Sequence, residues 1–167
     1  RQAGAKAADR VVVQAGKSPE ALALCLACLR IGAIYTPLNT AYTPAELEYF
    51  LQDADPALLV LDQEADRPKA VAPGVPVETL GDGGTLSAAA RTAPPHREQA
   101  RFDLDAPAAM LYTSGTTGRP KGAVLSRRVL ASNAAALARI WEFGPEDVLL
   151  HALPIFHAHG LFISTNT

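Results

Sequence analysis

The first third of the chain alternates short apolar runs with helix patterns, and this alternation limits the possible folds more than any other feature. Apolar runs of strand length occur at residues 11–13, 34–38 and 58–61. Helix patterns separate them, from Ser18 to Ile31 and from Thr43 to Ala54. Strands that alternate with helices are typical of a parallel sheet with helices packed against it. The sequence therefore predicts an α/β fold with a mostly parallel sheet flanked by helices.

Both helix patterns carry start and stop signals. Ser18 followed by Pro19 is a cap with proline in the first turn, and Gly32 is placed to end the helix. Thr43 and Glu46 have the spacing of a capping box, and Asp55-Pro56 ends the second pattern. Helical spacing predicts that this second helix buries one face, made of Leu47, Phe50, Leu51 and Ala54.

Two cysteines, Cys25 and Cys28, lie in the middle of the first helix pattern. Their Cys-x-x-Cys spacing is also found in redox and metal sites. Reactive pairs lie at an exposed helix start, whereas these two lie inside an apolar stretch. We therefore interpret them as small buried core residues.

Residues 63–105 are rich in proline and glycine, which interrupt any regular pattern. The sequence predicts a surface loop here, with a short strand at 75–79 and a short helix near 86–91. A linker between domains is the alternative, because loops of this length are uncommon inside a compact domain.

Regular patterns return after residue 105. Strands are predicted at 108–112, 122–125 and 147–153. Ser126 is placed to cap a helix, and one face of that helix carries Val129, Leu130, Asn133, Ala134, Leu137 and Ile140.

The segment 112–122, Tyr-Thr-Ser-Gly-Thr-Thr-Gly-Arg-Pro-Lys-Gly, joins two of these strands and carries the most chemical information. Glycines allow backbone N–H groups to approach a phosphate, hydroxyls add further donors, and Lys121 adds positive charge. This composition favours a polyphosphate site, with a plain polar hairpin turn as the alternative. The segment lacks the Walker pattern of nucleotide-binding loops, in which the lysine opens a helix.

This segment resembles the signature loop of the adenylate-forming superfamily, which includes acyl- and aryl-CoA synthetases, peptide-synthetase adenylation domains and luciferases. Residues 29–39 and 153–160 resemble two further motifs of the superfamily, in the same order. The runs 39–50 and 149–157 are similar to malonyl-CoA synthetases in particular. The resemblance covers essentially the whole chain. It implies that residues 1–167 are part of the large N-terminal domain of such an enzyme.

The resemblance also implies a reaction: a carboxylate attacks the α-phosphorus of ATP, and the thiol of coenzyme A then displaces AMP. Mg²⁺ would assist the first step. The carboxylate would be malonate or a similar short dicarboxylate such as methylmalonate, and acetate and other short acids are the alternatives. Lys121 would screen phosphate charge, and His157 would lie beside the acyl carboxylate and the α-phosphate. The residues implied to hold the β- and γ-phosphates are Thr113, Ser114, Gly115, Thr116, Thr117 and Gly118.

The other histidines receive weaker assignments. His151 is interpreted as structural, and His96 as uninformative. A metal site at His157 and His159 is the disfavoured alternative, because the sequence offers no nearby third ligand. We expect no metal ligands in this chain.

The resemblance divides the chain into an α/β half (1–62), a loop-rich part (63–105) and a part with the phosphate loop and the substrate motif (106–167). Later superfamily motifs, including those of a small C-terminal domain, are absent here, so we expect an incomplete domain that is inactive alone. One departure is that residues 126–130 read Ser-Arg-Arg-Val-Leu where the family often has Ser-His-x-Asn-Leu.

Composition limits the remaining classes. The net charge of -2 and the lack of a basic run argue against a nucleic-acid partner, and no apolar stretch is long enough for a membrane span. We expect a cytoplasmic protein. The alternatives are an adenylation domain that loads a carrier protein, a plain ATPase or kinase, and a non-catalytic nucleotide-binding module.

Overall fold

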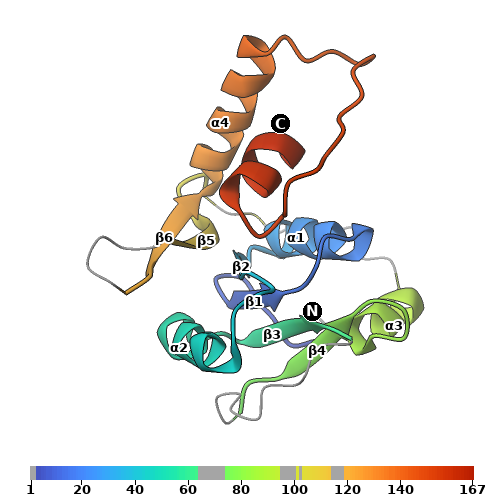
Figure 1. The fold of residues 1–167 in the computed structure, drawn as a ribbon, viewed down its shortest axis with the longest axis vertical. Coiled ribbons are helices and arrows are strands. Elements are labelled where there is room, and N and C mark those ends of the chain that lie inside the picture. The colour runs from blue at the N-terminus through green and yellow to red at the C-terminus, as the bar shows by residue number, and fades with distance from the viewer. Residues whose placement is uncertain (1–2, 64–73, 95–100, 102, 114–118) are drawn as a thin grey trace.

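The computed structural model describes residues 3–63, 74–94, 101, 103–113 and 119–167. Its centre is a six-stranded sheet in the order β4-β3-β1-β2-β5-β6 (Figure 1). The strands are β1 (Arg10–Gln14), β2 (Ile34–Pro37), β3 (Leu58–Asp62), β4 (Val77–Leu80), β5 (Pro107–Thr113) and β6 (Lys121–Ser126). All neighbouring strands are parallel except β5 and β6, which form an antiparallel hairpin. The predicted α/β fold with a mostly parallel sheet is confirmed.

The first two helices cover opposite faces of this sheet. Helix α1 (Pro19–Ile31) buries Ala21, Cys25 and Cys28 in a core that includes Val11 and Val13. Helix α2 (Pro44–Ala54) buries its apolar face in a second core with Val12. Successive residues of β1 thus point into different cores, as expected for a central strand that is buried on both sides.

The predicted helix ends are confirmed in detail. The Ser18 hydroxyl accepts a hydrogen bond from the Ala21 amide, and Gly32 ends α1 with a φ of 84°. Thr43 and Glu46 form the capping box of α2. The four predicted face residues Leu47, Phe50, Leu51 and Ala54 are all buried.

The middle of the chain contributes to the same sheet. Strand β4 pairs with β3, and helix α3 (Thr85–Thr92) packs beside β4. Thr79 and Thr85 join the two elements, because the Thr79 amide donates to the Thr85 hydroxyl at 2.9 Å. The short strand and helix expected here are present, so the described residues of this segment belong to the domain and are not a linker.

The last part of the chain differs from its prediction. Helix α4 (Arg127–Ile140) starts at Ser126 as expected, but of its apolar face only Leu130 is buried, while Val129 and Ile140 are exposed. The strand predicted at 147–153 is wrong: the segment runs without strand pairing to a π-helix, η1 (His159–Thr165), that packs beside α4 (Figure 1). A strand needs a neighbour to satisfy its backbone groups, and the described residues place none beside this segment.

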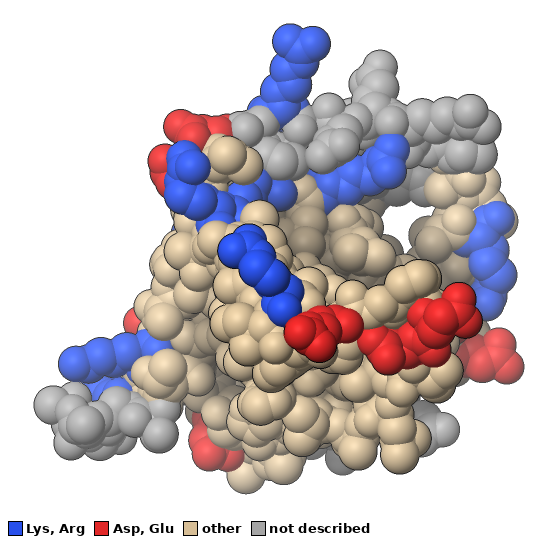
Figure 2. All heavy atoms as spheres, turned by 90° about the horizontal axis from the view of Figure 1, so that it is seen from above, with Lys and Arg blue, Asp and Glu red and all other residues tan. Residues whose placement is uncertain are grey.

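The charged side chains are spread out. On the face shown in Figure 2, basic and acidic side chains lie in several small groups, some of them adjoining, with uncharged surface between them. Among the described helices, none combines the length and the apolar character needed to cross a membrane.

Candidate functional site

The sheet topology predicts a ligand site at the edge formed by the carboxyl ends of the parallel strands. Helix α2 carries the chain from β2 back across the sheet to β3, whereas β5 continues outward into β6. Neighbouring strands β2 and β5 therefore send their connections in opposite directions. In open α/β sheets, ligands bind in the crevice outside the carboxyl ends of two such strands.

The residues that follow β2 are held in place by β1. The Leu38 amide donates to the carbonyl oxygen of Val13 at 2.8 Å. The Gln14 amide nitrogen donates to the carbonyl oxygens of Asn39 at 3.0 Å and of Tyr42 at 3.1 Å. One strand-end side chain thus fixes the turn from Asn39 to Tyr42 at the carboxyl edge.

The β5–β6 hairpin brings both ends of the predicted phosphate loop to this edge. Thr113, the last residue of β5, is paired in register with Lys121, the first residue of β6. Both side chains are exposed. The predicted phosphate-binding residues Ser114, Gly115, Thr116, Thr117 and Gly118 lie outside the described residues.

A tight turn carries His157 to the same edge. A Cβ atom on Gly160 would overlap the carbonyl oxygen of Pro154, so only glycine allows the start of η1 to lie against this turn. Lys17 supports the preceding residues, because its ammonium donates to the carbonyl oxygen of His151 at 2.6 Å. The ring of His157 is exposed and lies 4.6 Å from the ring of Phe156, centroid to centroid.

These segments enclose a cavity of about 220 Å³. Its wall comes from the end of β2 and the turn after it, from the end of β5, and from the turn before η1. The lining residues are Pro37, Leu38, Asn39, Tyr42, Leu111, Tyr112, Thr113, Phe156, His157 and Ala158. The structure thus brings together two predicted site residues, Thr113 and His157. Lys121 does not line the cavity, but lies on the strand that pairs with Thr113.

Sequence reasoning did not assign Asn39, Tyr42 or Tyr112 to the site. The pKa of Tyr112 is raised because its ring is partly buried and, secondly, because its hydroxyl donates to Asp53 at 2.6 Å. Tyr112 therefore remains a neutral donor over the ordinary pH range. Its position just before the glycine-rich segment was the signal that could have identified it.

His151 and the cysteines have structural roles, as predicted. The His151 Nε2 lies 2.8 Å from the carbonyl oxygen of Gly160 and joins η1 to the preceding segment. Both cysteines are buried and unpaired. Burial raises the pKa of each thiol from 9.0 to about 12, which leaves essentially no reactive thiolate at neutral pH.

Metal-binding side chains do not gather in the described part of the chain, where no three His, Cys, Asp or Glu residues form a cluster. His157 and His159 are both exposed, but only His157 lines the cavity, and none of the other described residues that line it is His, Cys, Asp or Glu.

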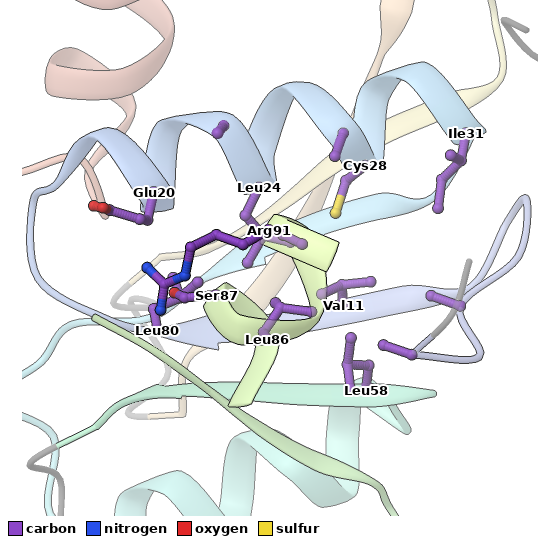
Figure 3. Close-up of a pocket in the computed structure, with 15 residues that line it drawn as sticks. Val11, Glu20, Leu24, Cys28, Ile31, Leu58, Leu80, Leu86, Ser87 and Arg91 are labelled. Atoms are coloured by element: carbon purple, nitrogen blue, oxygen red, sulfur yellow. The ribbon is translucent and has the colours of Figure 1, made fainter. Parts of the chain in front are cut away.

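A larger cavity of about 500 Å³ lies elsewhere, between α1, α3 and the sheet (Figure 3). Its wall is mostly apolar, with Glu20, Ser87 and Arg91 as its polar members. None of the predicted site residues lines it. The two cavities are therefore distinct, and the predicted site residues Thr113 and His157 line the smaller one.

Comparison with known proteins gives a consistent picture. Residues 1–167 match the family described as AMP-binding enzyme. The chain belongs to this family. Among curated relatives, it is 38% identical to "Malonate--CoA ligase ACSF3, mitochondrial" of Xenopus laevis, over 78% of this chain and 23% of that protein. It is 33% identical to "Oxalate--CoA ligase" of Arabidopsis thaliana, over 95% of this chain and 33% of that protein.

Solved structures of MatB from Rhodopseudomonas palustris are also similar. The apo form is 50% identical with a TM-score of 0.93, and the ATP-bound form is 48% identical with a TM-score of 0.91. Both matches cover 99% of this chain and 34% of MatB. The chain thus spans between about a quarter and a third of the length of these three proteins, and it has the fold of the corresponding part of MatB.

Proposed function

We propose that the protein containing this chain is an ATP-dependent acid–CoA ligase that acts through an acyl-adenylate. The observation that carries the proposal is the cavity at the carboxyl ends of β2 and β5, which both Thr113 and His157 line. Membership of the AMP-binding enzyme family, with relatives named as CoA ligases, supports the same reaction.

The phosphate site would be formed by residues 113–118 and Lys121. The carboxylate of the substrate would attack the α-phosphorus, and pyrophosphate would leave. Attack by an anion on a polyanion is slow unless positive charge and fixed donors stabilise the transition state. The hydroxyl of Thr113 would donate to a phosphate oxygen, and the exposed ammonium of Lys121 would screen the negative charge of the β- and γ-phosphates.

His157 would act at the other end of the reaction. Its imidazole is exposed at the cavity wall, beside Phe156, and can donate a hydrogen bond to the acyl carboxylate or to an α-phosphate oxygen. Such a donor stabilises charge that increases in the transition state.

Magnesium and coenzyme A complete the proposal. Mg²⁺ would neutralise phosphate charge when bound. The described residues offer no cluster of three ligands for it, so phosphate oxygens and groups beyond the described residues would have to hold the ion. Coenzyme A would supply the thiol that displaces AMP from the acyl-adenylate.

The proposed substrate is malonate or a similar short dicarboxylate, such as methylmalonate. The support is the similarity to proteins named for malonate and oxalate, together with the small volume of the cavity. A second carboxylate needs a cationic partner. None of the described residues that line the cavity is lysine or arginine, so that partner would come from another part of the protein.

The proposal is tested by ATP–pyrophosphate exchange with the complete protein and with malonate, methylmalonate, acetate and a panel of amino acids. Exchange driven by malonate or methylmalonate is the expected result. Exchange with amino acids alone would indicate a carrier-loading adenylation domain. A folded protein that binds ATP but shows no exchange with any acid would contradict the proposal and favour a non-catalytic module.

Two substitutions test the residue roles in the same assay. Lys121→Ala should raise the KM for ATP, and His157→Ala should lower the rate of exchange, each by about tenfold or more. The matched control is Lys6→Ala, because Lys6 is exposed and does not line the cavity. The substitution also keeps the backbone amide of Lys6, which donates to Asp9. Unchanged kinetics in both site variants would contradict the assigned roles.

A further inference from the structure

Helix α2 presents two polar side chains to the β5–β6 hairpin. Tyr49 and Asp53 are four residues apart, which places them one above the other on the same side of the helix. Neither residue lines the cavity at the carboxyl edge. Their hydrogen bonds are instead directed at the two strands that flank residues 114–118.

Each residue holds a different arm of the hairpin. The Tyr49 hydroxyl donates to the carbonyl oxygen of Pro120, next to Lys121, at 2.9 Å. Asp53 accepts a hydrogen bond from the Tyr112 hydroxyl, next to Thr113, at 2.6 Å. Tyr112 lies opposite Gly122 in the hairpin, one pair further than Thr113 and Lys121 from the point where the chain connects β5 to β6. One turn of α2 therefore contacts both arms at the level where the predicted phosphate-binding residues begin.

Aromatic packing makes this attachment rigid. Phe50 is 2% exposed and lies in the core between α2 and the sheet. Its ring centroid lies 4.6 Å from that of Tyr112 and 5.4 Å from that of Tyr49. Aromatic contacts at these distances add to the hydrophobic stabilisation. The two hydroxyl groups are thus presented from rings that are themselves fixed.

Gly122 brings the two arms close together. A Cβ atom at this position would lie 2.9 Å from the Met110 sulfur, so a larger residue would require the Met110 side chain on β5 to move. The hairpin is therefore closely packed on its own strands and attached to α2 on both arms.

We propose that Tyr49 and Asp53 are positioning residues for phosphate recognition: by holding the Pro120 carbonyl and the Tyr112 hydroxyl, they set the separation of Thr113 and Lys121 for ATP. This inference rests on the proposed function. The two residues act through the hairpin and do not contact the nucleotide. The loss of either hydrogen bond leaves the hairpin formed but allows its arms to move, so the effect falls on ATP affinity.

The test uses the complete protein and the variants Tyr49→Phe, Asp53→Ala and the double variant. Tyr49→Phe keeps the ring and removes only the hydroxyl. We expect each single variant to weaken ATP binding and raise the KM for ATP by about two- to tenfold, the usual size of one hydrogen bond. The KM for the carboxylic acid and the kcat should change by less than about twofold. Asp53→Asn keeps an oxygen that can accept from Tyr112 and should restore most of the affinity.

Gln52→Ala is the matched control. Gln52 lies on the same helix, is exposed and bonds only to Glu48 among the described contacts, so its removal should leave ATP affinity unchanged. ATP binding is measured by calorimetry as well as by kinetics, and thermal unfolding is recorded for every variant.

The outcomes separate this inference from the proposed function. If the wild type is active and the folded double variant has an unchanged KM for ATP, the inference is overturned and the ligase proposal stands. A fall in kcat and thermal midpoint without a change in ATP affinity shows a merely structural role and also overturns it. If the wild type binds ATP but catalyses no exchange, the ligase proposal fails, and calorimetry of the variants still decides the inference. A wild type that does not bind ATP overturns both.

Discussion

The region from β1 to β3 and the region from α4 to the end of η1 use apolar residues in opposite ways. In residues 10–62, helices α1 and α2 close both faces of the sheet, and Phe50 is 2% exposed. In residues 127–167, Val148 is 95% exposed and Leu150 is 92% exposed. The first region supplies most residues of both cores. The second contributes only Leu130, Ile155, Leu161 and Phe162 to one of these cores and leaves other apolar side chains uncovered. The difference shows that a segment can carry a recognisable sequence motif while many of its apolar side chains stay exposed.

The largest expected effect contrasts one buried and one exposed side chain. In this chain, Phe50→Ala should lower the free energy of unfolding by about 3–5 kcal/mol, because it opens a cavity between α2 and the sheet. Val148→Ala should change it by less than about 0.5 kcal/mol. Denaturant unfolding followed by circular dichroism measures both values, and similar costs for the two variants would contradict the comparison.

The Val148 substitution should have a larger effect in the complete protein. This chain covers 34% of MatB, so a complete protein of that size has additional chain that can cover Val148. We expect Val148→Ala to cost at least about 1 kcal/mol there. A cost as small as in the isolated chain would show that Val148 stays exposed.

The second prediction concerns a tight backbone contact in the otherwise open region. Gly160→Ala would force a Cβ atom into the carbonyl oxygen of Pro154. We expect a loss of about 1–3 kcal/mol of stability and, in the complete protein, at least about tenfold slower acid-dependent exchange, because the turn that carries His157 must shift.

Gly144→Ala is its control. A Cβ atom on Gly144 would meet only the Asp147 carboxylate, at 4.0 Å, so this variant should be nearly neutral. Stability and exchange would be compared in parallel. Equal effects of the two substitutions would mean that contact with Pro154 is not the cause.

The same comparison explains what the sequence could predict. Helices α1 and α2 were predicted with their caps because Ser18, Gly32, Thr43 and Glu46 are local signals, and packing agrees with them. The strand expected at 147–153 was wrong, because its apolar residues are typical of a strand but no described neighbour pairs with them. Local patterns predict helices and strands well only where other parts of the same chain supply the neighbours against which these elements pack or pair.

The site was predictable to a similar extent. The motifs identified Thr113 and His157, and the structure places both on one cavity. Asn39 and Tyr42 line that cavity because β2 lies beside β5, an order that the sequence did not specify. Tyr49 and Asp53 were also missed, because their hydrogen bonds depend on which helix lies against the hairpin.

A smaller effect tests how much local signals contribute to the first region. Thr43→Ala removes the side chain that accepts a hydrogen bond from the Glu46 amide and so opens the capping box of α2. We expect a loss of about 1 kcal/mol in the free energy of unfolding. Thr43→Ser keeps the hydroxyl and should recover most of it. A loss as large as that of Phe50→Ala would mean that the cap, and not the buried face, dominates the stability of α2.

The smallest effect is a dependence on pH that arises from the same cap. The pKa of Glu46 is lowered from its ordinary value of 4.5, because its carboxylate accepts hydrogen bonds from the amide of Thr43 at 2.8 Å and from its hydroxyl at 2.7 Å. A carboxyl whose pKa is lower in the folded state stabilises the fold above its ordinary pKa, and that stabilisation is lost as the pH falls through the lowered pKa.

Glutamine at position 46 can still accept a hydrogen bond but does not titrate. The thermal midpoint of the wild type should therefore exceed that of Glu46→Gln near neutral pH, and the gap should narrow on acidification. Glu48→Gln removes one carboxylate from the same helix without touching the cap and serves as the control for charge. A difference in thermal midpoint that widens on acidification would show that the protonated form of Glu46 stabilises the fold more than the carboxylate does. That result would contradict the geometry of the cap, in which the carboxylate only accepts hydrogen bonds.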